Sequence, residues 1–303
     1  MHKVLITGIT GFLGSHIAEK LISRHIAVIG LKRPGSDTWR CREFEEQVEW
    51  IDIDSDGNYG QAILNSGCDT IIHGAWIGVE AGEREDWAKQ SKNIPFLVKL
   101  LELAKGAGIK KIIFLGSQAE YGNIDGKIAE DHPSEALNAY GGIKLACMEI
   151  LKAFCNANQI DWIWLRIFSI FGEKENSNWL IPSLVKKINE GGNMDFTPGE
   201  QKYAYLYVKD FSELMYKIVN TPIASGIYNI SSPQSRSIRS LIEEIRDFID
   251  PAFRLNFGAL SYRPGQSMHM EGDMRKLTAQ IGEVTFTDFS VALQYTLTYY
   301  INN

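Results

Sequence analysis

The chain has 303 residues, of which 45% are hydrophobic and 22% charged, so it can bury a core without disulfides or metals. Its formal net charge of −6 excludes the basic footprint of a nucleic-acid-binding protein. Disulfide frameworks and metal sites are not predicted either, because there is no His/Cys cluster and the cysteines are few and scattered: Cys41, Cys68, Cys147 and Cys155.

The N-terminal segment carries no targeting signal that we can identify. It lacks the apolar stretch and the small-residue cleavage site of a signal peptide. No run of about 18 apolar residues, the length that spans a membrane, occurs in the sequence. We therefore expect a cytoplasmic protein with free thiols and no membrane partner.

Short apolar runs alternate with longer amphipathic stretches in the first half of the chain. The apolar runs predict six strands, at Lys3–Thr7, Ala27–Leu31, Val48–Ile53, Thr70–His73, Lys111–Leu115 and Asp161–Ile167. The most regular amphipathic stretches predict helices at Phe12–Ile22 and at about 83–105 and 139–156. This alternation predicts an α/β fold, a doubly wound parallel sheet of the Rossmann type with helices on both faces.

The pattern loosens beyond about residue 171. A polar loop at Glu173–Trp179 is followed by short segments at 204–208, 210–219, 226–231 and 237–249. We expect a dinucleotide-binding domain over residues 1–170, to which residues of about 203–231 return. Residues 171–303 then form most of a smaller α/β substrate domain.

A glycine-rich loop joins the first predicted strand to the first predicted helix. Gly8 allows a tight turn, Gly11 lets the backbone approach a pyrophosphate, and Gly14 lets the helix pack closely on the strand. The start of the helix offers unpaired N–H groups to phosphates. Glycines alone are weak evidence, but their place between strand and helix predicts dinucleotide binding.

The second predicted strand ends in a basic pair instead of the acidic residue that holds a ribose 2′-hydroxyl. Lys32 and Arg33 are suited to a 2′-phosphate, so the sequence favours NADP over NAD, although the pair also fits a solvated turn. Asp52, at the end of the third strand, is placed either to contact adenine or to cap a helix.

A tyrosine and a lysine follow at helical spacing. Tyr140 and Lys144 lie four residues apart, so both point to one face of the predicted helix. A nearby ammonium group favours the phenolate and lowers the pKa of a tyrosine. Ser117 comes just after the fifth strand, where its hydroxyl can bind a substrate oxygen.

Together these residues resemble the extended short-chain dehydrogenase/reductase family of nucleotide-sugar epimerases, dehydratases and reductases. The resemblance spans nearly the whole chain, and the spacing GxxGxxG of the loop is typical of it. The matching segments are Ser117–Gly122 for SSxxVYG, Tyr140–Lys144 for YGxSK with Ile143 at the serine, Leu165–Gly172 for LRxFNVYG and Tyr205–Asp210 for FxYVxD.

The resemblance implies a catalytic triad of Ser117, Tyr140 and Lys144, with Tyr140 moving a proton as hydride passes between a sugar carbon and nicotinamide. It also implies that Arg263 grips the nucleotide diphosphate and that Asn93 lies near the active site. Expected cofactor contacts are Gly8, Gly11, Phe12, Leu13, Gly14, Lys32, Arg33, Asp52, Ile53, His73, Ala75, Tyr140, Lys144 and Ile167. Expected substrate contacts are Trp76, Gln118, Tyr121, Ser169, Asn178, Trp179, Leu180 and Arg263. His73 and Trp76 also fit a purely structural role.

Departures from the family pattern narrow the reaction. Family dehydratases carry an Asp-Glu pair directly after the catalytic hydroxyl, where this chain has Gln118 and Ala119; Glu120 stands one position too late. The Cys and His of 3,5-epimerase/reductases are absent as well. Tyr203 replaces an arginine that contacts phosphate, and Ser169 replaces a substrate-binding asparagine.

Two reactions remain, and Lys32 with Arg33 favours the first. One is NADPH-dependent reduction of a 4-keto, often 6-deoxy, nucleotide sugar for cell-surface polysaccharides; the other is 4-epimerisation with bound NAD. A regulatory protein that binds NADP without turnover is a more remote alternative. The helices at about 83–105 and 139–156 could form the dimer interface common in the family, so we expect a homodimer.

Overall fold

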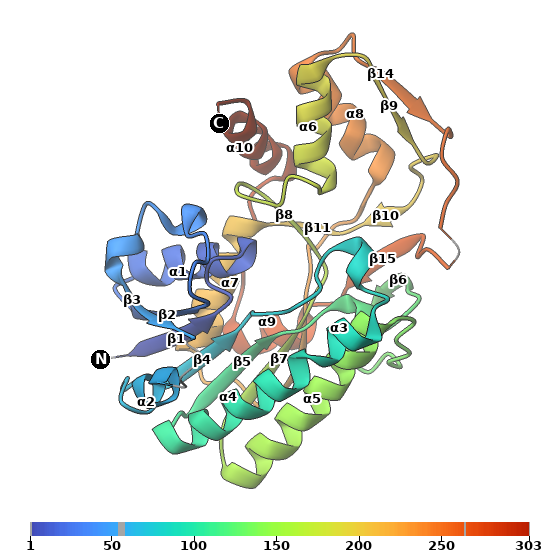
Figure 1. Cartoon of the computed structure of the whole chain (residues 1–303). Coiled ribbons are helices and arrows are strands. Elements are labelled where there is room, and N and C mark those ends of the chain that lie inside the picture. The colour runs from blue at the N-terminus through green and yellow to red at the C-terminus, as the bar shows by residue number, and fades with distance from the viewer. Residues whose placement is uncertain (1, 54–57, 264, 303) are drawn as a thin grey trace.

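A seven-stranded sheet forms the centre of the molecule (Figure 1) in a computed structural model that describes residues 2–53, 58–263 and 265–302. All its strands are parallel, in the order β12-β7-β5-β4-β1-β2-β3. Their bounds are β1 Lys3–Thr7, β2 Ala27–Lys32, β3 Val48–Asp52, β4 Thr70–His73, β5 Lys111–Leu115, β7 Asp161–Ile167 and β12 Gly226–Ile230. The order reverses between β1 and β4, where ligands bind in such sheets. The predicted doubly wound fold is confirmed.

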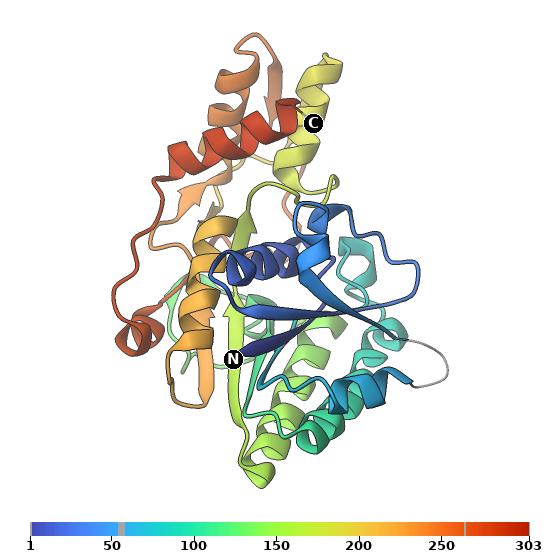
Figure 2. The same cartoon turned by 90° about the vertical axis from the view of Figure 1, so that its left-hand side faces the viewer.

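Helices cover both faces of this sheet. Val4 and Ile6 of β1 pack into one apolar cluster and Leu5 into another, because successive side chains of a strand point to opposite faces. One cluster includes helices α1 Phe12–Ser23 and α7 Val208–Asn220; the other includes α2 Asn58–Leu64, α4 Asn93–Ala107 and α5 Ala139–Asn158. Figure 2 shows α1 and α7 on one side and α4 and α5 on the other. Burial on both faces explains the continuous apolar runs of the strands.

The long helix predicted over about 83–105 is wrong in its first part. The chain forms a short 3₁₀ turn, η3 Ala81–Glu83, then α3 Trp87–Ser91 and the separate helix α4. Pro95 explains the break, because a proline has no N–H for the carbonyl of Ser91 and crowds it in a continuous helix. The Asn93 side chain instead donates to the Gln90 carbonyl at 2.9 Å.

A second lobe follows the carboxyl ends of β7 and β12 in the chain. Figure 1 shows its helices above the sheet. They are α6 Leu180–Glu190, α8 Ile238–Ile249 and α10 Phe289–Asn302, beside the parallel pair β9 Asn193–Phe196 and β14 Arg254–Phe257. No helix among the described residues is both long and apolar enough to cross a bilayer.

Small sheets connect the lobe to the large sheet. One pairs β8 Ser169–Phe171 with β11 Tyr205–Tyr207; the other has the order β13 Arg236–Ser237, β10 Lys202–Tyr203, β15 His269–Gly272 and β6 Asp125–Ile128. The remaining elements are α9 Arg275–Ile281 and the 3₁₀ turns η1 Trp39–Cys41, η2 Glu45–Gln47 and η4 Gln118–Glu120. Because β6 pairs with β15, the segment after β5 is tied directly to the late part of the chain.

Candidate active site

The glycine loop after β1 has the geometry of a phosphate cradle. Gly8 adopts a φ of 72°, and its carbonyl accepts the Gly11 N–H at 3.0 Å. A methyl group on Gly14 would overlap this same carbonyl oxygen, so the close approach of α1 to the loop requires glycine. No side chain caps the start of α1, and its first turn, which includes Phe12 and Leu13, has no acidic residue. These N–H groups are therefore available to an anion.

Lys32, the last residue of β2, and Arg33, which follows it, differ in their surroundings. The Lys32 ammonium donates to the Asp52 carboxylate at 2.6 Å, so these two expected cofactor contacts form an ion pair. Arg33 is exposed, and no partner of its side chain is found within the described ranges. Ile53 lies beside them, because its N–H donates to the Lys32 carbonyl at 2.7 Å.

His73 is held in the core at the end of β4. Its ring is 2% exposed, and its Nδ1 lies 2.6 Å from the Thr7 hydroxyl oxygen, which also accepts the Ala75 N–H at 3.1 Å. Burial, with a smaller contribution from Lys144, lowers the pKa of His73 to about 3. The His73 imidazole is therefore neutral and packed where β1 and β4 end. This agrees with the interpretation of His73 as a structural residue.

Ser117, Tyr140 and Lys144 lie together. Asn138 precedes helix α5 and caps it, because its side chain accepts the Gly141 N–H at 2.9 Å, and this cap fixes the turn that carries Tyr140. The Lys144 ammonium donates to the Leu115 carbonyl at 2.8 Å, at the end of β5. Ser117 is 8% and Lys144 4% exposed, so water hardly reaches either group.

Burial decides the charges of this group. It raises the pKa of Tyr140, against the opposing effects of the Arg84 guanidinium and a hydrogen bond with Ser117. It lowers the pKa of Lys144 to about 7, and the negative charge of Glu120 opposes this shift. The cation nearest the Tyr140 ring is Arg84, with Cζ 5.0 Å from the ring centroid, against 5.8 Å for Lys144 Nζ.

Two residues of the site had no recognisable pattern in the sequence. Arg84 comes from the turn after η3, and its carbonyl also accepts the Tyr140 N–H at 2.9 Å. Gln90 is fully buried and accepts the Trp76 indole N–H at 2.8 Å. Trp76 in turn lies over the Lys144 ammonium, 3.8 Å from the ring centroid. Only tertiary contacts distinguish these side chains from other surface or core residues.

The expected substrate residues differ in how far their side chains are exposed. Gln118 begins the turn η4 after β5, and Ser169 begins β8, just after β7 ends at Ile167; both side chains are half-buried. Tyr121 does not face the site: it is 1% exposed, and its hydroxyl donates to the Asn229 side chain at 2.7 Å. We therefore correct this expectation, because the side chain packs behind the site.

The loop before α6 closes one side of the site. Asn178 and Trp179 precede Leu180, the first residue of α6, and Trp179 is 44% exposed. The Arg84 guanidinium lies 5.9 Å from the Trp179 ring centroid. The loop is also joined to the segment after β4, because the Asn176 amide donates to Glu80 at 2.5 Å.

Arg263 lies on a separate exposed loop between β14 and β15. This loop is anchored by Tyr203, whose hydroxyl donates to the Ser267 carbonyl at 3.1 Å and accepts from the Gln266 amide at 3.3 Å. Tyr203, which stands at the family's arginine position, therefore supports the loop that carries Arg263.

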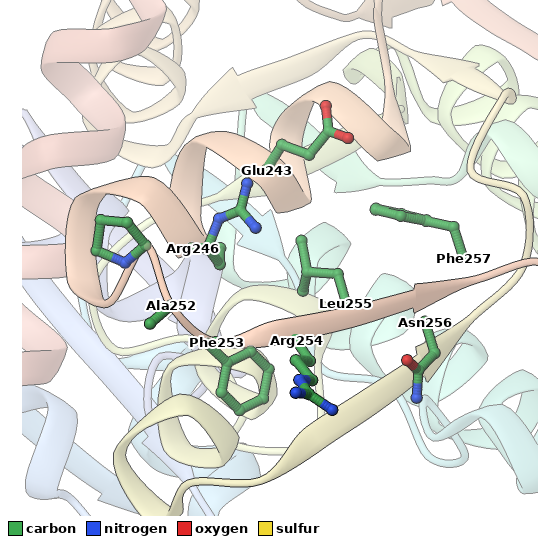
Figure 3. Close-up of a pocket in the computed structure, with 9 residues that line it drawn as sticks. Glu243, Arg246, Ala252, Phe253, Arg254, Leu255, Asn256 and Phe257 are labelled. Carbon is green, nitrogen blue, oxygen red and sulfur yellow. The ribbon is translucent and has the colours of Figure 1, made fainter.

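A hollow of about 480 Å³ lies elsewhere, between α8 and β14 in the second lobe. Figure 3 shows its lining, which includes Arg246, Phe253, Arg254 and Phe257. Neither element carries any residue of the Ser117, Tyr140 and Lys144 group. The hollow is thus separate from the site at the sheet.

Comparison with known proteins gives a family match and several relatives. Residues 4–231 match the model of the NAD dependent epimerase/dehydratase family. The chain is 25% identical to the CDP-abequose synthase of Salmonella muenchen over 91% of this chain and 90% of that protein. It is also 25% identical to a dTDP-6-deoxy-L-talose 4-dehydrogenase (NAD(+)) of Aggregatibacter actinomycetemcomitans, over 80% and 88% of the two chains.

A similar solved structure is the UDP-N-acetylglucosamine 4-epimerase of Methanobrevibacter ruminantium M1 in complex with UDP-N-acetylmuramic acid. The two structures superpose with a TM-score of 0.89 at 26% identity, over 99% of this chain and 98% of that one.

Proposed function

Because the chain belongs to the NAD-dependent epimerase/dehydratase family, we propose that it is an NAD(P)-dependent oxidoreductase that reduces a 4-keto sugar on a nucleoside diphosphate. The observation that carries the proposal is the group formed by buried Ser117 and Lys144 and half-buried Tyr140, at the carboxyl end of β5 and the start of α5. One relative is named as a deoxysugar 4-dehydrogenase, and one similar solved structure is named as a nucleotide-sugar 4-epimerase. Both names describe chemistry on nucleotide sugars.

The chain's own residues fit a dinucleotide. Gly8, Gly11 and Gly14 bring the backbone close to the start of α1, where uncapped N–H groups suit a pyrophosphate. Phe12 and Leu13 lie in this first turn, and Lys144 would hold the nicotinamide ribose. When bound, the nicotinamide supplies or accepts the hydride.

Tyr140 is proposed to give the proton that the carbonyl oxygen needs. Because burial raises its pKa, the phenol keeps its proton at neutral pH and can act as the acid in a reduction. Ser117 is proposed to donate a hydrogen bond to the same substrate oxygen and so polarise the carbonyl. The positive charges of Arg84 and Lys144 then stabilise the phenolate left on Tyr140.

Dehydration lacks its acid–base pair. Gln118 and Ala119 carry no ionisable side chain, and the nearest carboxylate, Glu120, is fully buried with Arg166. A group that must move a proton at a sugar carbon has to reach the substrate. Glu120 has no such access, so we favour a simple redox reaction at C4.

NADP is the proposed cofactor, with NAD as the alternative. Exposed Arg33 is suited to a 2′-phosphate, whereas Lys32 is already paired with Asp52. The name of the Aggregatibacter relative includes NAD(+), which favours NAD. Arg33→Ala should raise KM for NADPH about tenfold and leave KM for NADH unchanged if the guanidinium binds the phosphate; equal effects on both would contradict NADP preference.

The second candidate is a nucleotide-sugar 4-epimerase with bound NAD. The full-length similarity to a solved 4-epimerase favours it, and the same Ser117, Tyr140 and Lys144 would serve oxidation followed by reduction.

The proposed protein is a homodimer in the cytoplasm that contributes to polysaccharide synthesis. The adjacent helices α4 and α5 are its proposed dimer surface.

One assay separates these functions. The purified chain is mixed with NADPH or NADH and CDP-, dTDP-, UDP- or GDP-linked 4-keto-6-deoxy sugars, with the matching 4-hydroxy sugars as controls. A reductase oxidises the cofactor only with the keto sugars. An epimerase interconverts the 4-hydroxy sugars, detected by NMR, without net cofactor oxidation. Cofactor binding without either reaction across the panel would favour the non-catalytic alternative.

A further inference from the structure

A fully buried carboxylate lies directly behind the Ser117, Tyr140 and Lys144 group. Glu120 ends the turn η4 and has 0% exposure. It accepts the Ser117 N–H at 2.7 Å, the Trp164 indole N–H at 2.9 Å and the Arg166 Nε–H at 2.9 Å. Three donors, two from the strand β7 and one from the start of the turn η4, therefore hold one carboxylate in a single position.

Glu120 and Ser117 hold each other in a reciprocal arrangement. The carboxylate accepts the backbone N–H of Ser117, while the Ser117 hydroxyl oxygen accepts the backbone N–H groups of Ala119 and Glu120. A serine hydroxyl has two acceptor lone pairs and one donor proton. Because backbone groups occupy the acceptor side, the proton is left to be donated outward, to the side on which the Tyr140 hydroxyl is affected by Ser117.

Arg166 accounts for how this charge is tolerated away from water. It is 2% exposed, it donates to the Ser134 hydroxyl at 2.8 Å, and its guanidinium lies 4.1 Å from the Tyr121 ring centroid. A buried carboxylate with a hydrogen-bonded cation can remain ionised, whereas an isolated one would take up a proton. Burial raises the pKa of Glu120, and the Arg166 guanidinium opposes this shift and favours the charged form. The turn η4, which carries Glu120, packs against helix α5.

Lys144, on α5, lies near this charge: its ammonium donates to the Leu115 carbonyl, two residues before the Ser117 N–H that the Glu120 carboxylate accepts. Burial lowers the pKa of Lys144, and Glu120 is the largest influence that raises it again. The other titratable groups facing Lys144 are Cys147 and Tyr140 on its own helix, Arg84 from the turn after η3 and His73 from β4. Among these, Arg84 repels the ammonium and His73 is neutral, so Glu120 is the main stabilising charge.

We infer that Glu120 is a positioning residue that directs the Ser117 hydroxyl proton away from the backbone, to the side on which Tyr140 lies, and holds a negative charge near Lys144. The catalytic consequence rests on the proposed function; the effect on Lys144 does not. Glu120 never touches substrate, because it is sealed behind Ser117 by Trp164 and Arg166. The Glu120 carboxylate thus has a role at this position that does not require it to move a substrate proton.

The effect on Lys144 can be measured without substrate. Lys144 is followed by NMR titration of protein labelled with carbon-13 at lysine Cε, with Lys144→Met to assign the signal. Glu120→Gln keeps an acceptor oxygen and removes the charge, so the pKa of Lys144 should fall by about one unit or more, a tenfold loss of proton affinity. Glu120→Asp keeps the charge at a shorter reach, so Lys144 should titrate close to wild type.

Turnover tests the second half of the inference. With active enzyme, Glu120→Gln should shift the alkaline limb of the pH–rate profile to lower pH by the same amount as the NMR titration. Glu120→Asp should lower kcat with little change in this limb, because the Ser117 hydroxyl loses its fixed direction. If no substrate is turned over, the proposed function fails while the titration still decides the effect of Glu120.

A second variant tests the inference if Glu120→Gln does not fold. Removing one partner of a buried ion pair leaves Arg166 uncompensated, so Glu120→Gln is combined with Arg166→Met, which removes both charges. The pKa of Lys144 should again lie below the wild-type value. If Lys144 titrates as in wild type in whichever of these variants folds, the inference is wrong.

Discussion

The inner wall of the site and its outer rim are built differently. The inner wall, which we define as Ser117, Glu120, Tyr140 and Lys144, has three buried members and a half-buried Tyr140, and hydrogen bonds join it to β5 and β7. The outer rim consists of Trp179 and Arg263, which lie exposed on loops of the second lobe. Hydrogen bonds to strands and turns of the fold hold the side chains of the wall. The side chains of the rim make fewer such contacts.

This contrast suggests a division of labour. Groups that move protons must be held within narrow limits of distance and direction, and the wall provides them. Groups that bind different nucleotides can lie on loops, which accept substitution with little effect on the core. If this is right, changes to the wall should affect kcat and changes to the rim should affect KM.

Tyr140→Phe is expected to give the largest effect. Loss of the phenol proton should lower kcat by about 10² to 10⁴-fold, the usual contribution of a general acid. Cofactor binding, measured by fluorescence titration, should change less than threefold by the same reasoning, because the ring remains. The matched control is Tyr228→Phe, which removes a buried hydroxyl that donates to the Ala224 carbonyl. Unchanged turnover in Tyr140→Phe would contradict the assignment.

Gly14→Ala tests the glycine loop on the cofactor side of the site. The added methyl group overlaps the Gly8 carbonyl, so the free energy of unfolding should fall by about 3 kcal/mol and dinucleotide binding should be lost. Gly82→Ala serves as control, because nothing lies within 4 Å of its new methyl group. Urea denaturation of both variants decides the matter, and equal stabilities would show that the loop relaxes without cost.

Arg263→Ala tests the rim. An arginine bound to a diphosphate contributes charge-assisted hydrogen bonds, so its loss should raise KM for the nucleotide sugar about tenfold. Steady-state kinetics should show kcat within about twofold of wild type, because no group that moves a proton is changed. Arg254→Ala, at the hollow of Figure 3, should change neither constant. A fall in kcat at constant KM would place Arg263 with the wall.

The last expected effect concerns the dependence of stability on pH. Folded Lys144 loses its proton above about pH 7, while the unfolded chain keeps it to about pH 10.4. Unfolding between these values therefore takes up a proton, so this group makes the free energy of unfolding rise with pH by at most about 1.4 kcal/mol per unit. Denaturant titrations should show this rise in wild type relative to Lys144→Met. Parallel curves would mean that Lys144 keeps an ordinary pKa when folded.

Several expectations failed for identifiable reasons. The helix predicted over about 83–105 was interrupted because Pro95 removes a hydrogen bond that apolar periodicity does not record. Tyr121 matched a family motif but faces the core, where Asn229 from β12 binds its hydroxyl. Arg84 and Gln90 were missed because an isolated arginine and an isolated glutamine carry no local pattern.

By itself the sequence determined the parallel sheet, the glycine loop and the pairing of Tyr140 with Lys144. These features depend on short-range patterns: apolar runs form buried strands, glycines permit close backbone approach, and residues four apart share a helix face. Only the tertiary structure decided the partners of Lys32 and Glu120 and the direction in which Tyr121 points. Those depend on strands and turns distant in the chain, and the charges of Glu120 and Lys144 depend on how completely the fold excludes water around them.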